Sequence, residues 1–279
     1  MLKWPKIINK TLSVKLSLMV VCEIALLLFV ALAIMFYFAR QTLKAEAMRN
    51  GEQTLESTVQ HIDNILLSVE QATGNIYWNL LGKTNNREQM FHYCQTVIES
   101  NPYIVGCAIA MNPNFYDDKK PFMAYVHRKG FNNESEELVM AKAFGGKPYT
   151  QQTWYTEPLT EGHACWMEPV KDTPNDEAVT CFSLPLYDGN WKPIGVLSVD
   201  VSLALLSQIV LDAKPSANGY STLLGKNGAF LVHPDPVKLS HETVFTQSEN
   251  GADPSVRIAA EAMVNGERGY KQFVMNGED

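Results

Sequence analysis

The feature that most constrains this 279-residue chain is a nearly unbroken apolar run near its N-terminus, at residues 16–39. About 20 consecutive apolar residues carry a helix across the roughly 30 Å hydrocarbon core of a bilayer. The run contains a single acidic residue, Glu23, near its start. We therefore predict a transmembrane helix at residues 16–39, preceded by a tail at residues 1–15.

The flanks of this run predict its orientation and indicate that it is an uncleaved anchor. A cleaved signal peptide has a shorter apolar core and small residues at the cleavage site, whereas this run ends in bulky residues before Arg40. The tail carries four lysines, and positive charge favours the cytoplasmic side of a membrane. We expect the tail to be cytoplasmic and residues 40–279 to be extracytoplasmic.

Charge and cysteine content exclude several classes of function. The net charge is -7, and residues 1–40 hold five basic side chains against Glu23, so the remainder carries -11. An acidic remainder of this size argues against a nucleic-acid partner. The five cysteines show no C-x-x-C or other zinc-like spacing, so we expect no metal and no other cofactor. One disulfide could form in an oxidising compartment, with its pairing left open.

Residues 40–83 are predicted to form a long stalk helix. No proline occurs from residue 41 to residue 83, and apolar or near-apolar residues recur at alternating spacings of four and three, which is a heptad pattern. Such a helix could pack on its own domain or against the same helix of a second copy, and we expect a homodimer through the stalk and transmembrane helices. The positions are Leu55, Val59, Ile62, Leu66, Val69, Thr73, Ile76 and Leu80.

After residue 102 the periodicity becomes that of strands separated by turns. The pattern predicts an α+β fold in which an antiparallel sheet is fronted by helices, and we assign residues 84–214 to this first lobe. The predicted strands are residues 103–111, 122–128, 138–144, 165–171, 178–187 and 192–201, and the predicted helices are residues 87–100 and 202–211.

Residues 215–279 predict a second, smaller lobe. The turn Lys226-Asn227-Gly228 separates two expected strands, at residues 220–225 and 229–233, because Asn-Gly favours a tight hairpin. A helix at residues 254–264 and a strand at residues 269–275 should follow. A last Asn-Gly turn, at residues 276–277, has no return strand. We therefore expect this lobe to be incomplete and the chain to be an N-terminal piece of a longer protein.

Four segments after the long helix are loose motifs singly but fairly specific in their order and spacing. They are Thr153-Trp154-Tyr155-Thr156-Glu157-Pro158, Trp166-Met167-Glu168-Pro169, residues 195–203 and residues 226–234. From about residue 41 onward the chain resembles the double Cache sensor domain of bacterial chemoreceptors, histidine kinases and membrane-bound serine phosphatases. The resemblance implies two stacked antiparallel-sheet, PAS-like lobes beside one long helix, with ligand bound in the membrane-distal lobe.

The same resemblance implies a biological role. Such a chain would be the extracytoplasmic ligand-sensing region of a receptor in the bacterial inner (cytoplasmic) membrane, used in chemotaxis or two-component signal transduction. Ligand would shift the packing of the first lobe on the long helix, and the helix would pass the signal to a cytoplasmic effector that this chain does not contain.

A stretch within the first lobe is rich in groups suited to hold a small polar molecule, namely aromatic walls with a few polar side chains. A protonated amine would gain cation–π attraction there and a charged hydrogen bond from a carboxylate. A carboxylate on an otherwise apolar strand requires a partner if it is buried, although a helix cap through Ser202 is a plainer explanation for Asp200. The predicted ligand-binding residues are Tyr149, Gln152, Trp154, Tyr155, Trp166, Asp172 and Asp200. The three aromatic residues Trp154, Tyr155 and Trp166 could instead be core residues of the sheet.

The resemblance also bears on the ligand. In amino-acid-binding members an arginine two positions before the Trp-Tyr pair grips the ligand carboxylate, and here Gln152 stands in that place. Val170 replaces a tyrosine, while Asp172 and Asp200 keep two aspartates that take the amino group. Because Gln152 offers only neutral hydrogen bonds, an ordinary α-amino acid should bind poorly. We expect an amine or another small polar metabolite.

Two other functions remain open at this point. A membrane-anchored periplasmic hydrolase could pair Glu168 with Asp172, which share a face of an extended strand, as glycosidases pair two carboxylates. The sequence shows no nucleophile elbow, metal-binding His pair or phosphate loop, and His233 suits a turn at a strand end. A protein-interaction or dimerisation module would leave the aromatic and acidic residues unexplained. We therefore predict a sensor region and no enzyme.

Overall fold

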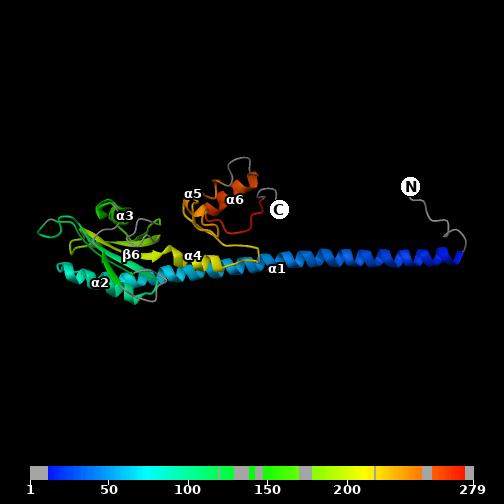
Figure 1. Ribbon diagram of the computed structural model, residues 1–279, viewed down its shortest axis with the longest axis horizontal. Helices are drawn as coiled ribbons and strands as arrows, with labels where there is room; N and C mark the ends of the chain where they lie inside the picture. Colours follow the sequence, from blue (N-terminus) through cyan, green and yellow to red (C-terminus); the bar gives the residue numbers. More distant parts are fainter. Residues whose placement is uncertain are drawn as a thin grey trace. The chain divides into compact units, whose positions relative to one another are not determined.

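The computed structural model describes residues 12–118, 120–128, 138–141, 147–169, 178–216, 218–246 and 253–273. The chain divides into two compact units, Met1–Gln53 and Thr54–Asp279. One helix, α1 (Leu12–Leu80), begins in the first unit and ends in the second (Figure 1). The described strands and the other described helices belong to the second unit.

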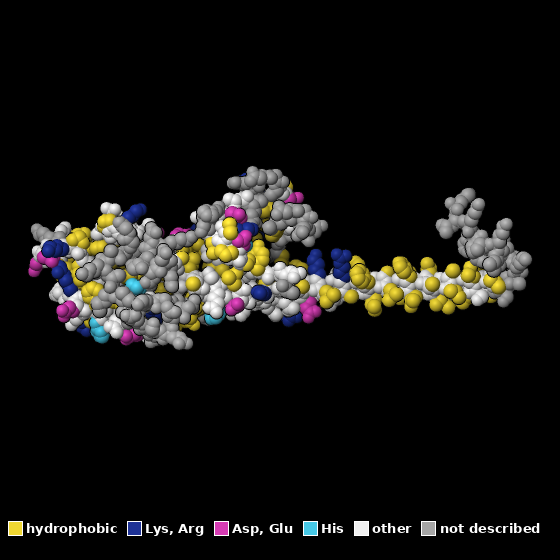
Figure 2. All heavy atoms as spheres, in the orientation of Figure 1, with side chains coloured by type: hydrophobic (Ala, Val, Ile, Leu, Met, Phe, Trp, Pro, Cys, Tyr) yellow, Lys and Arg dark blue, Asp and Glu magenta, His cyan; other side chains and the backbone are white. Residues whose placement is uncertain are grey.

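The N-terminal part of α1 has the surface of a membrane span. Figure 2 shows apolar side chains along this part of the helix, and large ones such as Phe29 are 73% exposed. The most apolar window of α1 has a mean hydropathy of 2.9 and is long enough to cross a bilayer. A helix that is apolar all round faces lipid or a protein core, and none of this window is buried inside the structure. The structure thus supports the predicted transmembrane helix by length and composition.

The distal part of α1 packs on its own domain. Val69 and Leu80 are fully buried there, and the hydroxyl of the buried Thr73 donates to the Val69 carbonyl at 2.6 Å. Leu55 and Val59, earlier in the same heptad seam, stay exposed. The distal part of the heptad seam therefore packs on this chain's own sheet. The exposed earlier part is left for the other alternative, contact with the same helix of a second copy.

The second unit is built on a six-stranded antiparallel sheet with the order β3-β2-β1-β6-β5-β4. Its strands are β1 (Ile104–Met111), β2 (Phe122–Arg128), β3 (Leu138–Ala141), β4 (Cys165–Trp166), β5 (Val179–Tyr187) and β6 (Pro193–Ser202). Long β1, β5 and β6 form the centre, while short β3 and β4 form the edges. The predicted α+β fold is confirmed, although β4 covers only the start of the strand expected at residues 165–171.

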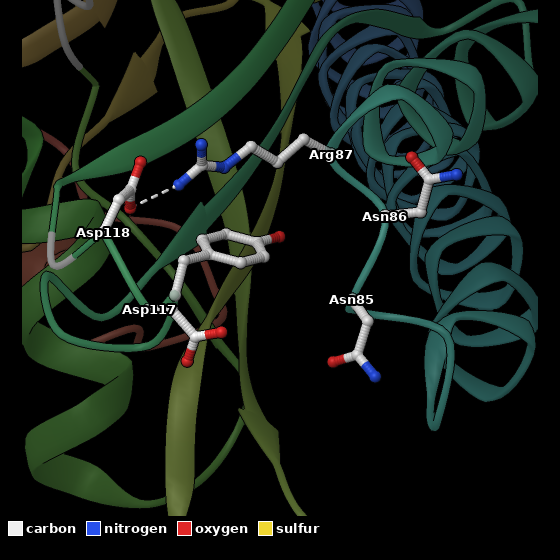
Figure 3. Close-up of a pocket in the computed structure, with 6 residues that line it drawn as sticks. Asn85, Asn86, Arg87, Asp117 and Asp118 are labelled. Atoms are coloured by element: carbon white, nitrogen blue, oxygen red, sulfur yellow. Dashed lines mark hydrogen bonds and ion pairs between the residues drawn. The ribbon is translucent and has the colours of Figure 1, made fainter.

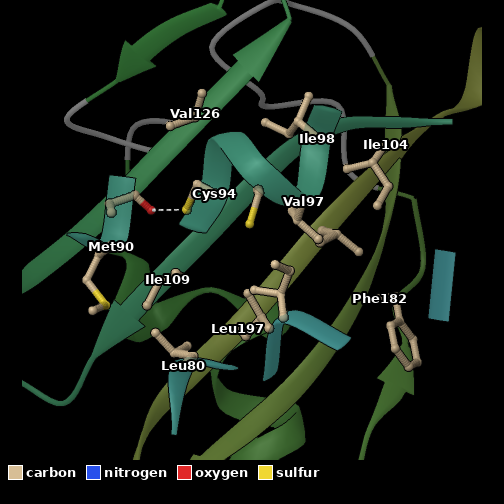
Figure 4. Packing of buried hydrophobic residues seen from close by; sticks show 14 of the residues in the cluster. Leu80, Met90, Cys94, Val97, Ile98, Ile104, Ile109, Val126, Phe182 and Leu197 are labelled. Atoms are coloured by element: carbon tan, nitrogen blue, oxygen red, sulfur yellow. Dashed lines mark hydrogen bonds between the residues drawn. The ribbon is translucent and has the colours of Figure 1, made fainter. Parts of the chain in front are cut away.

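One face of this sheet, the α1 face, packs against α1 and against α2 (Arg87–Ser100). Alternate strand residues point to it because successive side chains of a strand point to opposite faces. Figure 4 shows Leu80 of α1 and Cys94 of α2 near Ile109 and Leu197 of the sheet. Burial of such side chains contributes roughly 1.5–3 kcal/mol each, so this layer is the main core of the domain.

The other sheet face, the α3 face, packs against the 3₁₀ turn η2 (Tyr149–Gln151) and the helix α3 (Thr153–Glu161). In Figure 1 the helices α3 and α2 lie on opposite sides of the sheet. The α3 helix ends at Gly162, whose φ of 73° suits glycine because no Cβ opposes the left-handed region. The α3-face side chains of the central strands are small, since Ala108 and Ala110 are among them, and this leaves room for the aromatic residues that cover them.

Local signals explain where the helices of the first lobe begin. The Asn86 side chain caps α2 by accepting from the Glu88 backbone N–H at 3.0 Å, which satisfies one of the free amides of the first turn. The helix α4 (Leu203–Asp212) follows β6 directly, in agreement with the helix predicted at residues 202–211. Ser202 occupies its N-cap position but makes no side-chain capping hydrogen bond.

The second lobe holds a short hairpin and two helices. The hairpin joins β7 (Leu223–Leu224) to β8 (Phe230–Val232) across a turn where Gly228 has a φ of 78°, so the predicted Asn-Gly hairpin is confirmed. The helices are α5 (Lys238–His241) and α6 (Pro254–Val264), and the latter matches its predicted range. The strand expected at residues 269–275 is wrong for residues 269–273, which lack a paired strand among the described residues.

Candidate functional site

Asp200 is a buried acidic residue on the α3 face of the sheet. Its side chain is 1% exposed and lies on β6 between Val199 and Val201, both of which point to the α1 face. Asp200 therefore points to the α3 face. In the sheet register it stands beside Gly106 of β1 and Cys181 of β5. Burial of an unpaired carboxylate is unfavourable in free energy, so the groups that pair with Asp200 determine whether this face can bind a charged ligand.

Gly106 makes room for the Asp200 carboxylate. A Cβ at position 106 would collide with Asp200 Oδ2 and would lie 3.0 Å from the hydroxyl oxygen of Tyr125. A glycine inside a strand commonly marks such a close approach. Position 106 therefore accepts no side chain while the carboxylate stays in place.

Tyr125 and Cys181 are the hydrogen-bond partners of this carboxylate. The Tyr125 hydroxyl donates to Asp200 Oδ2 at 2.9 Å, and the Cys181 thiol also hydrogen-bonds to Asp200. His127, two residues along β2, stacks on Tyr125 with ring centroids 5.5 Å apart and planes inclined by 29°. All three side chains are buried. Together they form a polar centre, which we call the Asp200 centre, on a face that also holds the buried, hydrogen-bonded pair Ser183 and Ser198.

Burial dominates the electrostatics of the Asp200 centre. It raises the pKa of Asp200 above the ordinary 3.8, while the hydrogen bonds from Cys181 and Tyr125 and the charge of His127 oppose the rise. Burial and the neighbouring Asp200 charge likewise hold the pKa values of Tyr125 and Cys181 well above their usual ranges. The carboxylate thus lacks full compensation, and a cation beside it would favour its charged form.

The predicted aromatic residues of η2 and α3 lie on this same face. Tyr149, Trp154 and Tyr155 belong to one buried cluster with Tyr125 and Cys181. The Tyr155 ring meets the Tyr149 ring edge to face at 5.1 Å, and it meets the Trp154 ring at 6.1 Å. The structure therefore brings three of the predicted aromatic residues and Asp200 to one face of the sheet.

The hydroxyl groups of these aromatic residues already have partners within the fold. The Tyr149 hydroxyl donates to the Met111 carbonyl at 2.7 Å, and the Tyr155 hydroxyl donates to Asn112 Oδ1 at 2.6 Å. Burial raises the pKa of Tyr155 to about 12. Both hydroxyls fasten the α3 layer to the end of β1, so the rings, rather than these hydroxyls, are the groups left for a ligand.

Two predicted residues stand apart from the Asp200 centre. Trp166 points to the α1 face, where its ring lies 5.1 Å from that of Phe182 and its Nε1 donates to Glu70 Oε1 of α1 at 2.7 Å. It is therefore a core aromatic residue that binds the long helix, the alternative noted from the sequence. Gln152 is partly buried before the first turn of α3, and its Nε2 donates to the Lys147 carbonyl at 3.3 Å.

The remaining predictions concern acidic residues and His233. Asp172 and Val170 lie outside the described residues. Glu168, offered as half of a hydrolytic pair, is exposed. His233 is buried in the second lobe, and its Nδ1 accepts from the Asp235 backbone N–H at 2.9 Å, as expected for a residue that shapes a turn. Among the described residues no cluster of three or more His, Cys, Asp or Glu side chains could hold a metal ion.

A separate open hollow of about 470 Å³ lies at the start of α2 (Figure 3). Arg87 pairs with Asp118 at 2.7 Å, and its guanidinium carbon lies 4.3 Å from the centre of the Tyr116 ring. Asn85, Asn86 and Asp117 complete the lining. Because Arg87 is already paired and stacked, the hollow is best explained as the place where the loop after β1 is fastened to α2.

Comparison with known proteins identifies the domain. Residues 91–208 match the sequence model described as "Methyl-accepting chemotaxis protein-like, first PDC sensor domain". These residues are similar to the PDC sensor domain of chemoreceptors. The match includes most of α2, the six strands of the sheet, α3 and the Asp200 centre. It confirms the resemblance to Cache-type sensors that the sequence motifs indicated.

Individual relatives agree with this PDC sensor domain. The methyl-accepting chemotaxis protein McpC of Bacillus subtilis is 23% identical over 233 residues, which is 79% of this chain and 32% of McpC. The chain thus spans about a third of that relative, and it spans less of two other curated chemotaxis proteins.

Solved structures show the same fold. The methyl-accepting chemotaxis protein X has a TM-score of 0.58 and 20% identity, with 76% of this chain and 81% of that chain covered. The ligand-binding domain of Mlp24 with asparagine has a TM-score of 0.56 and 16% identity, with 83% and 85% covered. Both likenesses concern the fold alone.

Sequence reasoning missed most of the Asp200 centre. Tyr125, His127, Cys181 and Gly106 were not among the predicted site residues, although two signals were present. Tyr125 and His127 are separated by two positions in a strand, so they share a face, and a glycine within an apolar strand indicates a close approach. What the sequence alone lacked was the register that puts these strands beside Asp200.

Proposed function

We propose that this chain is the ligand-sensing part of a transmembrane receptor and that the Asp200 centre binds the protonated amino group of a small ligand. Residues 91–208 match the model of a chemoreceptor sensor domain, and McpC, a curated relative, is a chemotaxis protein. The observation that carries the ligand proposal is the buried Asp200 carboxylate, whose pKa is raised by burial in spite of two hydrogen bonds. A ligand ammonium would supply the missing positive charge.

The geometry favours a cation over an anion or a neutral sugar. One carboxylate oxygen, Oδ2, is held by Tyr125, so a ligand meets an acceptor-only group with capacity left for further donors. A hydrogen bond to a charged group contributes about 1.5–3 kcal/mol, and the rings of α3 can add cation–π attraction of up to about 2 kcal/mol. An anion placed on the same face would be repelled by the carboxylate.

The side chain at position 152 bears on the rest of the ligand. Gln152 carries no charge, and its amide already donates to the Lys147 carbonyl. It would therefore give a ligand carboxylate only neutral hydrogen bonds. Mlp24, a structural neighbour, has been solved with asparagine, which has both an amino group and an α-carboxylate, so it supports the amino group of the proposed ligand and not the lack of a carboxylate. We propose a primary amine without an α-carboxylate as the preferred class.

A matched set of three compounds tests the ligand class. We would measure the thermal unfolding midpoint of the chain in detergent micelles with n-butylamine, with L-norvaline, which adds an α-carboxylate to that amine, and with pentanoate, which lacks the amine. Ligand binding to the folded state raises the midpoint by mass action. We expect the order n-butylamine, then norvaline, with no shift from pentanoate.

Two variants locate the effect. Asp200→Asn should abolish the shift, while Asp117→Asn, which changes a carboxylate in the hollow beside α2, should leave it intact. A shift from pentanoate equal to that from n-butylamine, or a shift that survives in Asp200→Asn, would contradict the proposed ligand.

We further propose that the tail at residues 1–15 is cytoplasmic, that residues 40–279 are extracytoplasmic, and that two copies associate through α1. The four lysines of the tail support the orientation. Exposed Leu55 and Val59 support the dimer, because they continue a heptad seam beyond the part that the domain covers. Cross-linking between copies carrying Val59→Cys in membranes tests the dimer.

A further inference from the structure

The edge strand β4 and the residue after it have side chains on both faces of the sheet. Cys165 and Met167 belong to the α3-face cluster, together with Trp154 and Tyr155. Trp166, between them, belongs to the α1-face cluster. Residues 165–167 therefore contact the layer that covers the Asp200 centre and the layer that contains the long helix.

On the α3 face, this segment is fastened next to Asp200. The Met167 backbone N–H donates to the Cys181 carbonyl at 2.8 Å, and the Thr180 hydroxyl donates to the Met167 carbonyl at 2.8 Å. Cys181 stands beside Asp200 in the register and hydrogen-bonds to its carboxylate. A movement of β5 near Asp200 would therefore be transmitted to Met167 through Cys181.

On the α1 face, Trp166 is bonded to the long helix. Its Nε1 donates to Glu70 Oε1 at 2.7 Å, a short bond from an indole to a carboxylate, and its ring rests on Phe182. Glu70 follows Val69, which is fully buried where α1 packs on the sheet. Hydrogen bonds with one charged partner are about twice as strong as neutral ones. The bond thus joins the edge strand to α1 at a point where the helix is held firmly.

We propose that the Trp166–Glu70 hydrogen bond couples the Asp200 centre to α1, so that both residues are positioning residues for signal output and neither contacts the ligand. This inference rests on the proposed sensory function. A strand at the edge of a sheet has one strand neighbour, so β4 can move with fewer broken contacts than a central strand. Ligand at Asp200 would shift residues 165–167, and Trp166 would carry that shift to the helix.

A second hydrogen bond to α1 supplies the matched control. Asn101, at the end of α2, donates through Nδ2 to the Ser68 hydroxyl at 3.0 Å. Ser68 is two residues from Glu70 on the same helix, but Asn101 lies outside the α3-face cluster. Loss of this bond weakens the attachment of α1 without touching residues 165–167, so it separates a general loosening of the helix from loss of coupling.

The test is hydrogen–deuterium exchange of the chain in detergent micelles, read by mass spectrometry over residues 54–80, with and without n-butylamine. In the unchanged protein we expect the amine to alter exchange in these α1 residues and around β5. In Trp166→Phe, which keeps an aromatic ring but removes the donor, we expect the binding constant and the β5 response to stay and the α1 response to be lost. Ser68→Ala should retain the binding constant, the β5 response and the α1 response.

The conservative variant Glu70→Gln keeps an acceptor oxygen and should retain the α1 response, whereas Glu70→Leu should lose it. An α1 response that persists in Trp166→Phe, or that disappears equally in Ser68→Ala, overturns the coupling role.

Failure of the ligand proposal is distinguishable from failure of the coupling. If n-butylamine does not bind the unchanged protein, the ligand proposal fails, and Cys181→Ser then serves as the perturbation because Cys181 contacts Asp200. We expect Cys181→Ser to alter exchange over residues 54–80 when Trp166 is present and to leave it unaltered in the Trp166→Phe background. An unaltered helix in the first case, or an equal change in both, overturns the proposal.

Discussion

Removal of one hydroxyl should show how strongly the Asp200 charge depends on its partner. In Tyr125→Phe the ring and its stacking with His127 stay, while the 2.9 Å bond to Asp200 Oδ2 is lost. A hydrogen bond to a charged group contributes about 1.5–3 kcal/mol, against about 0.5–1.5 kcal/mol for a neutral one. At pH values above the folded-state pKa of Asp200, the variant should lose about 1.5–3 kcal/mol of unfolding free energy, and its melting midpoint should fall by about 3–12 °C.

The loss should depend on pH, and its sign follows from the raised pKa of Asp200. Below the ordinary carboxyl pKa of 3.8 the group is protonated, so the bond is neutral and the loss should shrink to about 0.5–1.5 kcal/mol. Above the folded-state pKa the carboxylate is charged and the full loss appears. Because the Tyr125 bond lowers the pKa of Asp200, its removal should raise that pKa further. Urea unfolding followed by circular dichroism, at neutral and at acid pH, measures both effects.

Tyr149→Phe is the matched control. It also removes a buried phenol hydroxyl, but this hydroxyl bonds neutral backbone groups: it donates to the Met111 carbonyl at 2.7 Å and accepts from the Phe122 N–H at 3.2 Å. Loss of these two bonds should cost about 1–3 kcal/mol, and the cost should be the same at both pH values. A loss in Tyr125→Phe that changes as little with pH as the loss in Tyr149→Phe would refute the view that Tyr125 supports a buried charge.

Two further predictions concern the same centre. Because the pKa of Asp200 is higher in the folded state than the ordinary 3.8, protonated Asp200 stabilises the fold. This contribution to the unfolding free energy is complete below pH 3.8 and is lost as the pH rises through the folded-state pKa. Asp200→Asn should therefore raise the unfolding free energy at neutral pH and flatten its pH dependence, as urea unfolding across that range will show. Gly106→Ala places a Cβ against the Asp200 carboxylate, so it should lower the unfolding free energy by about 1–3 kcal/mol and abolish the n-butylamine shift. Normal stability together with normal binding in Gly106→Ala would contradict the close approach.

The fold was largely predictable because each of its signals is local. Turn-rich segments between short apolar runs predicted the strands, the Asn227-Gly228 pair predicted the hairpin of β7 and β8, and the long apolar run predicted the span. The helix α3 was not predicted, since nine residues containing Pro158 give a weak helical pattern. Its stability comes from packing of Trp154 and Tyr155 on the sheet, and such packing cannot be read from a short window of sequence.

The candidate site was predicted only in part. Asp200 and the aromatic residues of α3 carry distinctive chemistry, so the sequence could single them out as candidates. The sequence left Trp166 either in the site or in the core, because the face of a strand residue depends on the strand register, and a shift of one residue moves every side chain to the other side. Tyr125 and Gly106 became visible only when the register of β1, β2 and β6 was known.

The buried charge of Asp200 has a consequence for the lifetime of the protein. At neutral pH an empty domain is held below the stability it would reach if the charge were neutralised. Proteases cleave proteins through transiently opened states, whose population falls as stability rises. Under the proposed function, ligand-bound protein should therefore resist degradation longer than ligand-free protein, and the amount of the protein in a membrane would then record how long ligand has been present.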